Sequence, residues 1–161
     1  MEEPSNKYIL LRHRVGLVLE KKLLTFGLKM QVLRGEILEG VPEAEQPMDS
    51  TKVAVVGIER KSLCLECPTE DVARLSEEET NLLLAITSSE GRYQTYIDRK
   101  LMVFGRQLSL GSTVFVEVKG HSNVLPGIVW YKGVLQLSLG TWFEVELTVS
   151  TRVLVKSRCW L

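Results

Sequence analysis

The sequence predicts an α+β fold: a small antiparallel β-barrel over residues 105–161, preceded over residues 1–104 by an extension that mixes strands and a helix. Two observations lead to this prediction. After Gly105, short segments of alternating apolar and polar residues are separated by glycines, a spacing typical of small barrels. Earlier in the chain, the segment that follows Ser76 has the pattern of a helix start.

Three segments of the extension are expected to hold most of its structure. Tyr8–Leu24 is apolar with interspersed charges and is interrupted by a glycine, which favours a strand pair over one long helix. Gly40–Thr51, with two prolines and three acidic residues, is expected to be a loop or linker. Lys52–Cys67 is expected to be two strands joined by a turn, with Leu63 and Leu65 on one face of the second strand.

The clearest helix start lies at the end of the extension, and we expect a capped helix near residues 76–100. Ser76 is placed to cap it, and Glu79, three residues on, completes a capping box. Arg99 and Lys100 suit the C-terminal end of this helix or of a second short one. The residues expected on its buried side are Leu82, Leu83, Ile86 and Tyr93.

The predicted barrel is rich in aromatic residues. In its first strand, Val114, Val116 and Val118 fall on one face. Two adjacent aromatic pairs follow, Trp130–Tyr131 and Trp142–Phe143, and alternation predicts that each pair places one ring in the core and one outside. These rings either cover the core of a small barrel or form an exposed groove that binds a peptide end.

Composition and charge exclude several classes of partner. Lys plus Arg and Asp plus Glu both number 20, so the net charge is zero, and we expect neither nucleic acid nor a membrane surface as a partner. Residues 35–92 have a net charge of −8, which we interpret as a solvated acidic surface, whereas residues 1–34 and 93–161 each have +4. No stretch approaches the ~18 uncharged apolar residues that a membrane span requires.

The sequence contains little that points to catalysis or to a metal. Cys64 and Cys67 form a single C-x-x-C motif without a second ligand pair, and strand alternation places them on opposite faces, which favours packing. The only histidines are His13 and His121, and no glycine-rich phosphate loop is present. We therefore expect no metal, no cofactor and no enzyme activity. With Cys159, the cysteines make an odd number, which predicts a reducing, cytoplasmic environment.

Three segments in order, GSTVFVEV, LPGIVWYKG and GTWFEVEL, resemble the CAP-Gly domain, over roughly Gly111–Leu147. The resemblance implies an SH3-like barrel. The family's G-K-N-D-G loop, which binds acidic-aromatic peptide tails, is replaced by TVSTRVLVKSRCWL, and Glu144 replaces a glycine. An incomplete barrel, truncated after the strand that ends in VEL, is therefore expected.

A second resemblance extends toward the N-terminus. The segment EETNLLLAITSSEGRY is similar to the one that precedes the first CAP-Gly domain in the family of the cylindromatosis deubiquitinase, and weaker similarity reaches back to KYILL. That family's catalytic domain is absent here, so hydrolysis of ubiquitin is not expected. The expectation is a truncated or diverged relative that lacks the catalytic domain.

These resemblances imply a non-enzymatic protein-interaction module. Its expected partners are acidic C-terminal peptide tails, tubulin or signalling adaptors, in the cytoplasm and at the microtubule cytoskeleton, with a link to ubiquitin signalling. The expected partner-binding residues are Trp142, Tyr131, Trp130, Phe143, Lys132 and Lys119. The glycines expected at structural turns are Gly127, Gly133 and Gly140.

The sequence also permits a second function of a different class. In this alternative, the chain is a structural remnant or a dimerising scaffold that binds no peptide tail. The loss of the last strands of the barrel leaves a sheet edge open, and the segment TRVLVK pairs there, within one chain or between two. A homodimer is therefore a further possible assembly, and light scattering separates it from a monomer.

Overall fold

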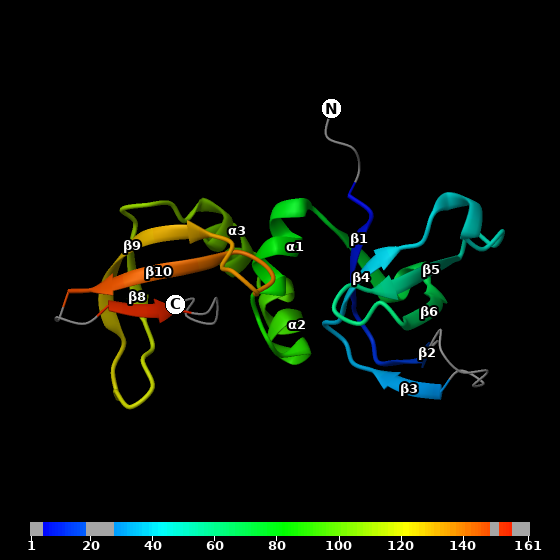
Figure 1. Cartoon of the computed structure of the whole chain (residues 1–161), viewed down its shortest axis with the longest axis horizontal. Coiled ribbons are helices and arrows are strands. Elements are labelled where there is room, and N and C mark those ends of the chain that lie inside the picture. Colours follow the sequence, from blue (N-terminus) through cyan, green and yellow to red (C-terminus); the bar gives the residue numbers. More distant parts are fainter. Residues whose placement is uncertain (1–4, 19–27, 149–151, 156–161) are drawn as a thin grey trace. The chain divides into compact units, whose positions relative to one another are not determined.

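The structure, a computed structural model, describes residues 5–18 and 28–148 and the backbone of residues 152–155. The chain divides into two compact units: the first comprises Met1–Thr80 with Ser88–Tyr93, and the second comprises Asn81–Thr87 with Gln94–Leu161. Antiparallel sheet dominates, with three helices between the sheets in sequence order, and this confirms the α+β class (Figure 1). The predicted division into an extension of residues 1–104 and a barrel of residues 105–161 stays a prediction.

The first unit is built on a seven-stranded antiparallel sheet with the order β3-β2-β6-β5-β4-β1-β7. The strands are β1 Lys7–Leu10, β2 Arg14–Val18, β3 Leu28–Val32, β4 Ile37–Gly40, β5 Lys52–Gly57, β6 Leu63–Pro68 and β7 Val72–Leu75. Two strands were predicted within Tyr8–Leu24, and both exist, although residues 19–24 lie outside the described part. They do not pair with each other: β1 pairs with β4 and β7, and β2 pairs with β3 and β6. Partners from later segments decide this pairing, and the local pattern does not contain them.

The hairpin of β5 and β6 confirms the prediction for Lys52–Cys67. Val55 faces Leu65 in the register, and both Leu63 and Leu65 are buried in the core of the first unit. Cys67 is buried while Cys64 is half-buried, as strand alternation predicts. The loop predicted before β5 connects β4 to β5, and its only regular structure is a short 3₁₀ turn, Glu43–Glu45.

The expected capped helix begins at Ser76, but it ends at Leu84, and two more short helices follow where one continuing or one second helix was expected. The three helices are α1 Glu77–Leu84, α2 Ser89–Ile97 and α3 Arg99–Gln107. Each break coincides with a new capping side chain: Ser88 Oγ accepts from the Gly91 N–H at 3.1 Å, and Asp98 Oδ1 accepts from the Leu101 N–H at 3.1 Å. The side chains of Leu82, Leu83 and Ile86 are buried as predicted, and Tyr93 is half-buried.

Arg99 and Lys100 begin α3, which corrects their predicted place at a helix C-terminus. The sequence pattern misled because the cap at Asp98 starts a new helix immediately before them. Basic residues in the first turn face the positive end of the helix dipole, which is unfavourable by about 0.3–1 kcal/mol each.

Ion pairs explain why the first turns of α2 belong to the first unit. Arg34 donates to both carboxylate oxygens of Glu90, at 2.9 and 2.8 Å, and its guanidinium lies 4.2 Å from the centre of the Tyr93 ring. Arg92, whose side chain is almost fully buried, donates to Glu59 at 2.6 Å. A buried guanidinium requires such a partner because the loss of its hydration is otherwise uncompensated.

The second unit contains a four-stranded antiparallel sheet with the order β11-β10-β9-β8 (Figure 1). Its strands are β8 Thr113–Val116, β9 Leu125–Gly133, β10 Trp142–Leu147 and β11 Arg152–Val155. Val114 and Val116 are buried and Val118 packs against the same core, as the alternation predicts. Residues of this core include Leu82, Leu108, Val129, Phe143, Val145 and Leu147.

Among the described residues, the four strands form an open sheet in which β11 and β8 are the edge strands and do not pair, so a closed barrel is not shown. The expected truncation after the VEL strand is corrected by β11, which follows β10 and pairs with it antiparallel, with Val145 opposite Val153. Residues 152–155 of the segment TRVLVK thus pair within their own chain, and the rest of that segment lies outside the described residues. An antiparallel strand needs only a short connection, so few residues beyond Leu147 suffice to add it.

Candidate functional site

A β-bulge in β9 determines how the first aromatic pair is presented. Tyr131 lies opposite Glu144 and Val129 lies opposite Val145, so Trp130 is an extra residue without a partner position in β10. Such an extra residue interrupts the alternation of a strand and redirects its side chains. Both aromatic residues are consequently exposed, Trp130 by 57% and Tyr131 by 37%.

The second aromatic pair is buried as a whole. Trp142 is 8% exposed and Phe143 is 4% exposed. Phe143 packs in the core of the second unit, while the indole Nε1 of Trp142 donates to the Leu139 carbonyl at 2.9 Å. The prediction of one buried and one exposed ring is therefore wrong for both pairs. The bulge leaves both rings of the first pair exposed. In the second pair, the loop before β10 accepts the hydrogen bond of the Trp142 indole, so this ring is buried as well.

The exposed face of β8 and β9 gathers large apolar side chains, which we call the aromatic face. It consists of Phe115, Ile128, Trp130 and Tyr131, all of them exposed, with Phe115 at 52%. Residues directly opposite in antiparallel strands point to the same side of a sheet. Glu146 lies opposite Ile128 and Glu144 opposite Tyr131, so two carboxylates border the aromatic face.

The two lysines expected in a groove have different surroundings. The Nζ of Lys132 donates to the carbonyls of Arg106 and Leu108, at 3.0 and 2.8 Å, and lies 5.8 Å from the centre of the Phe143 ring. Its ammonium is thus held against the negative C-terminal end of α3. Lys119 lies exposed in the connection that follows β8.

Gly127 lies inside β9, which corrects its assignment to a turn, whereas Gly133 is the last residue of that strand, where the loop to β10 begins. A Cβ on Gly127 would lie 2.4 Å from Val145 Cγ1, so this position requires glycine for close strand packing and not for a turn. Gly140, in the loop between β9 and β10, has a φ of +82°.

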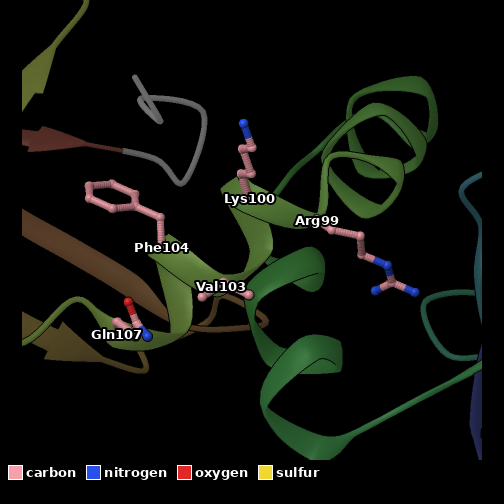
Figure 2. A pocket seen from close by; sticks show the side chains of 5 residues that line it. All are labelled: Arg99, Lys100, Val103, Phe104 and Gln107. Atoms are coloured by element: carbon pink, nitrogen blue, oxygen red, sulfur yellow. The ribbon is translucent and has the colours of Figure 1, made fainter.

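A second feature of this unit is a shallow hollow on α3, of about 420 Å³ (Figure 2). Its lining residues are Arg99, Lys100, Val103, Phe104 and Gln107. Sequence reasoning missed it because Arg99 and Lys100 were assigned to the end of a helix and not to the start of α3. The four-residue spacing of Lys100 and Phe104 was nevertheless visible in the sequence.

A larger hollow, of about 640 Å³, lies on the first unit and is lined by His13, Arg14, Val15, Gln31 and Glu66. It has charges of both signs. Arg14 also forms an ion pair with the fully buried carboxylate of Asp71, which ties this arginine to the core. Among the described residues, no group of three His, Cys, Asp or Glu side chains is placed to hold a metal ion.

Comparison with known proteins gives one consistent relationship. The chain resembles a part of CYLD. It is 29% identical to the ubiquitin carboxyl-terminal hydrolase CYLD of Bos taurus over 113 residues, which are 68% of this chain and 12% of the bovine protein. It is 32% identical to the human protein and 33% to that of Mus musculus, each over 93 residues, 56% of this chain and 10% of the relative. These matches confirm the resemblance that the sequence predicted.

The relationship has clear bounds. The matched region spans only about a tenth of the length of these CYLD proteins. No family model matches the chain, and no solved structure matches it. The CAP-Gly fold therefore stays a prediction. None of the described helices is long and apolar enough to cross a membrane.

Proposed function

We propose that this chain is a protein-interaction module that binds an extended segment of a partner protein on its aromatic face. The observation that carries the proposal is the exposure of Phe115, Ile128, Trp130 and Tyr131 on two adjacent strands. Interfaces concentrate their binding energy in a few large side chains, and Trp and Tyr are enriched among them. Four such side chains on neighbouring strands are more than the scattered apolar residues of an ordinary surface.

The charges beside the aromatic face favour a partner with basic side chains. Glu144 and Glu146 point to the same side of the sheet as Tyr131 and Ile128. Acidic-aromatic tails, which the CAP-Gly resemblance implies, would meet these carboxylates, while Lys132 is occupied at the end of α3. Exposed ion pairs contribute about 0–1 kcal/mol each, so burial of the aromatic rings must supply most of the affinity.

The similarity to CYLD supports a role in ubiquitin signalling. The named activity of those relatives is that of a ubiquitin carboxyl-terminal hydrolase, and this chain matches about a tenth of their length. We infer a role in binding and not in catalysis. Partners at the microtubule cytoskeleton remain part of the proposal through the CAP-Gly resemblance alone.

The test is a titration of the isotope-labelled chain with two peptides that share an apolar-aromatic core and differ only in carrying lysines or glutamates. The basic peptide is expected to shift the amide signals of β8 and β9 and the indole signal of Trp130. Trp130→Ala should weaken binding by about 10-fold or more. Met48→Ala, which removes an even more exposed apolar side chain from the first unit, is the control and should not change binding. Absence of shifts at millimolar peptide, or preference for the acidic peptide, contradicts the proposal.

A second candidate function is self-association. Among the described strands, β8 lies at an edge of its sheet and carries the exposed Phe115. An unpaired edge strand offers its backbone N–H and C=O groups to a second chain. Light scattering tests this function directly: a mass that stays that of one chain at all concentrations excludes it.

A further inference from the structure

The loop that connects β9 to β10 (Figure 1) contains the segment VLQLSL, residues 134–139, which we call the leucine loop. Its side chains include Leu137, which is fully exposed, together with Val134 at 66% and Leu139 at 47% exposure. The sequence from 133 to 143 contains no charged residue. The leucine loop therefore offers solvent an apolar surface that its own side chains cannot extend by ion pairs.

The backbone of Leu137 adopts a conformation that is unfavourable for leucine. Its φ is +63°, in the left-handed region that a Cβ atom disfavours. The Ser138 N–H donates to the Leu135 carbonyl at 3.1 Å, so Leu137 is the third residue of a β-turn, where a positive φ usually selects glycine or asparagine. Its fully exposed side chain gives the fold no burial in return. Backbone strain of this kind clusters at functional sites.

Side-chain hydrogen bonds hold the leucine loop on both sides of this turn. Before the turn, the Tyr131 hydroxyl donates to the Val134 carbonyl at 2.8 Å. After it, the indole Nε1 of the buried Trp142 donates to the Leu139 carbonyl at 2.9 Å. The position of Leu137 is thus set before any partner arrives. A segment that is already ordered loses less conformational entropy on binding.

We propose that the leucine loop is a docking element that inserts Leu137 into an apolar pocket of a partner protein. Val134 and Leu139 pack at the rim of that pocket. A few large side chains in fitted pockets supply most of the affinity of an interface. The leucine loop is distinct from the aromatic face, and the proposal does not depend on the function assigned to that face.

Three observations identify this partner. The uncharged sequence from 133 to 143 complements an uncharged pocket lining. The fixed position of Leu137 favours binding to a shaped pocket, whereas a fluid lipid surface accepts a side chain in any conformation. Three exposed apolar side chains are far fewer than the roughly 20–30 residues that each side of a stable dimer contributes, which disfavours a second copy of this chain.

The first test asks whether Leu137 serves its own fold, and it needs no partner. Leu137→Ala should leave the urea midpoint of the full chain close to its original value, because the side chain that is removed is fully exposed. Leu137→Gly should have a higher midpoint than Leu137→Ala, because glycine adopts this φ without strain. A clear drop in the midpoint of Leu137→Ala would show that the side chain stabilises its own fold, and would overturn the proposal.

The second test identifies the partner and measures its affinity. The probe is the full chain with a photo-crosslinking aliphatic residue at position 137, irradiated in a mammalian cell extract. The protein that it captures is purified and titrated with the unchanged chain and with Leu137→Ala, which should bind about 10-fold more weakly or worse. Capture alone does not support the proposal. No capture, or equal affinity of the two chains, overturns it.

Two control variants and two further measurements separate this proposal from its competitors. Leu110→Ala removes an exposed leucine outside the leucine loop, and it should alter the affinity less than about 2-fold. Trp130→Ala should do the same, and a loss equal to that of Leu137→Ala would assign the partner to the aromatic face instead. Sedimentation with phosphatidylcholine vesicles, or a dimer mass in light scattering, would overturn the proposal if Leu137→Ala abolished it.

Discussion

Ser76 and Glu79 close a reciprocal capping box at the start of α1: the Ser76 N–H donates to Glu79 Oε2 at 3.0 Å, and the Glu79 N–H donates to Ser76 Oγ at 3.1 Å. Ser76→Ala removes the second bond and should lower the free energy of unfolding by about 1 kcal/mol. Urea denaturation of both chains measures this difference in the free energy of unfolding. Ser76→Thr keeps a hydroxyl at the cap and should remain within about half of that loss. Equal losses for both variants would show that the hydroxyl is not the stabilising group.

Gly140 combines a positive φ with close contact to the helix region of its unit. A Cβ there would lie 2.3 Å from the Ala85 nitrogen and 2.5 Å from the Asn81 oxygen. Gly140→Ala should therefore destabilise the chain by about 3 kcal/mol, the sum of backbone strain and steric overlap. Gly120, with a φ of +95° and open space around it, isolates the first contribution. Gly120→Ala should cost only about 1 kcal/mol, and a similar loss at both positions would contradict the packing argument.

Asp71 is a fully buried carboxylate that forms ion pairs with Arg14 and, at 3.5 Å, with Arg12. Asp71→Ala should lower the free energy of unfolding by about 2–3 kcal/mol, less than for a completely enclosed pair because water reaches both arginines. Glu70→Ala is the matched control, since Glu70 is exposed and lies 3.7 Å from the same Arg12. It should change stability by no more than about 0.5 kcal/mol. A neutral effect of Asp71→Ala in urea denaturation would refute the structural role.

Cys67 should be the slower of the two cysteines of β6 to react. Burial raises the pKa of the Cys67 thiol above its ordinary value; the nearby charge of Arg14 opposes this rise in part, and that of Glu66 adds to it. A raised pKa leaves less thiolate at any pH below it, and the thiolate is the reactive form. Mass spectrometry after iodoacetamide treatment near pH 8 should show Cys64 modified before Cys67. In denaturing urea the two rates should become similar, and a faster Cys67 in the folded chain would contradict the structure.

Several local features could be predicted because neighbouring residues alone determine them. The capping box needs only Ser76 and Glu79, three positions apart. The hairpin of β5 and β6 follows from two alternating segments joined by a short turn, and the burial of Val114 and Val116 follows from period-two alternation. In each case the interacting groups lie close together in the sequence.

The candidate site was predicted less well because its geometry depends on pairing between strands. Trp130, Tyr131, Trp142 and Phe143 were named from the sequence, yet simple alternation predicted their exposure wrongly. The bulge at Trp130 arises from the register of β9 against β10, and no single strand specifies a register. The α3 hollow was missed because its first residues were assigned to the end of a preceding helix.

The sequence by itself determined the α+β class, the capped helix start, the main hairpin and the resemblance to CYLD, because these depend on local patterns or on residue identity. Tertiary structure decided which strands join the seven-stranded sheet, that β11 pairs with β10, and that Trp130 is exposed while Trp142 is buried. The physical reason is the same in each case. Hydrogen-bonded partners and buried neighbours come from distant segments, and only their packing selects one arrangement among those that the local pattern permits.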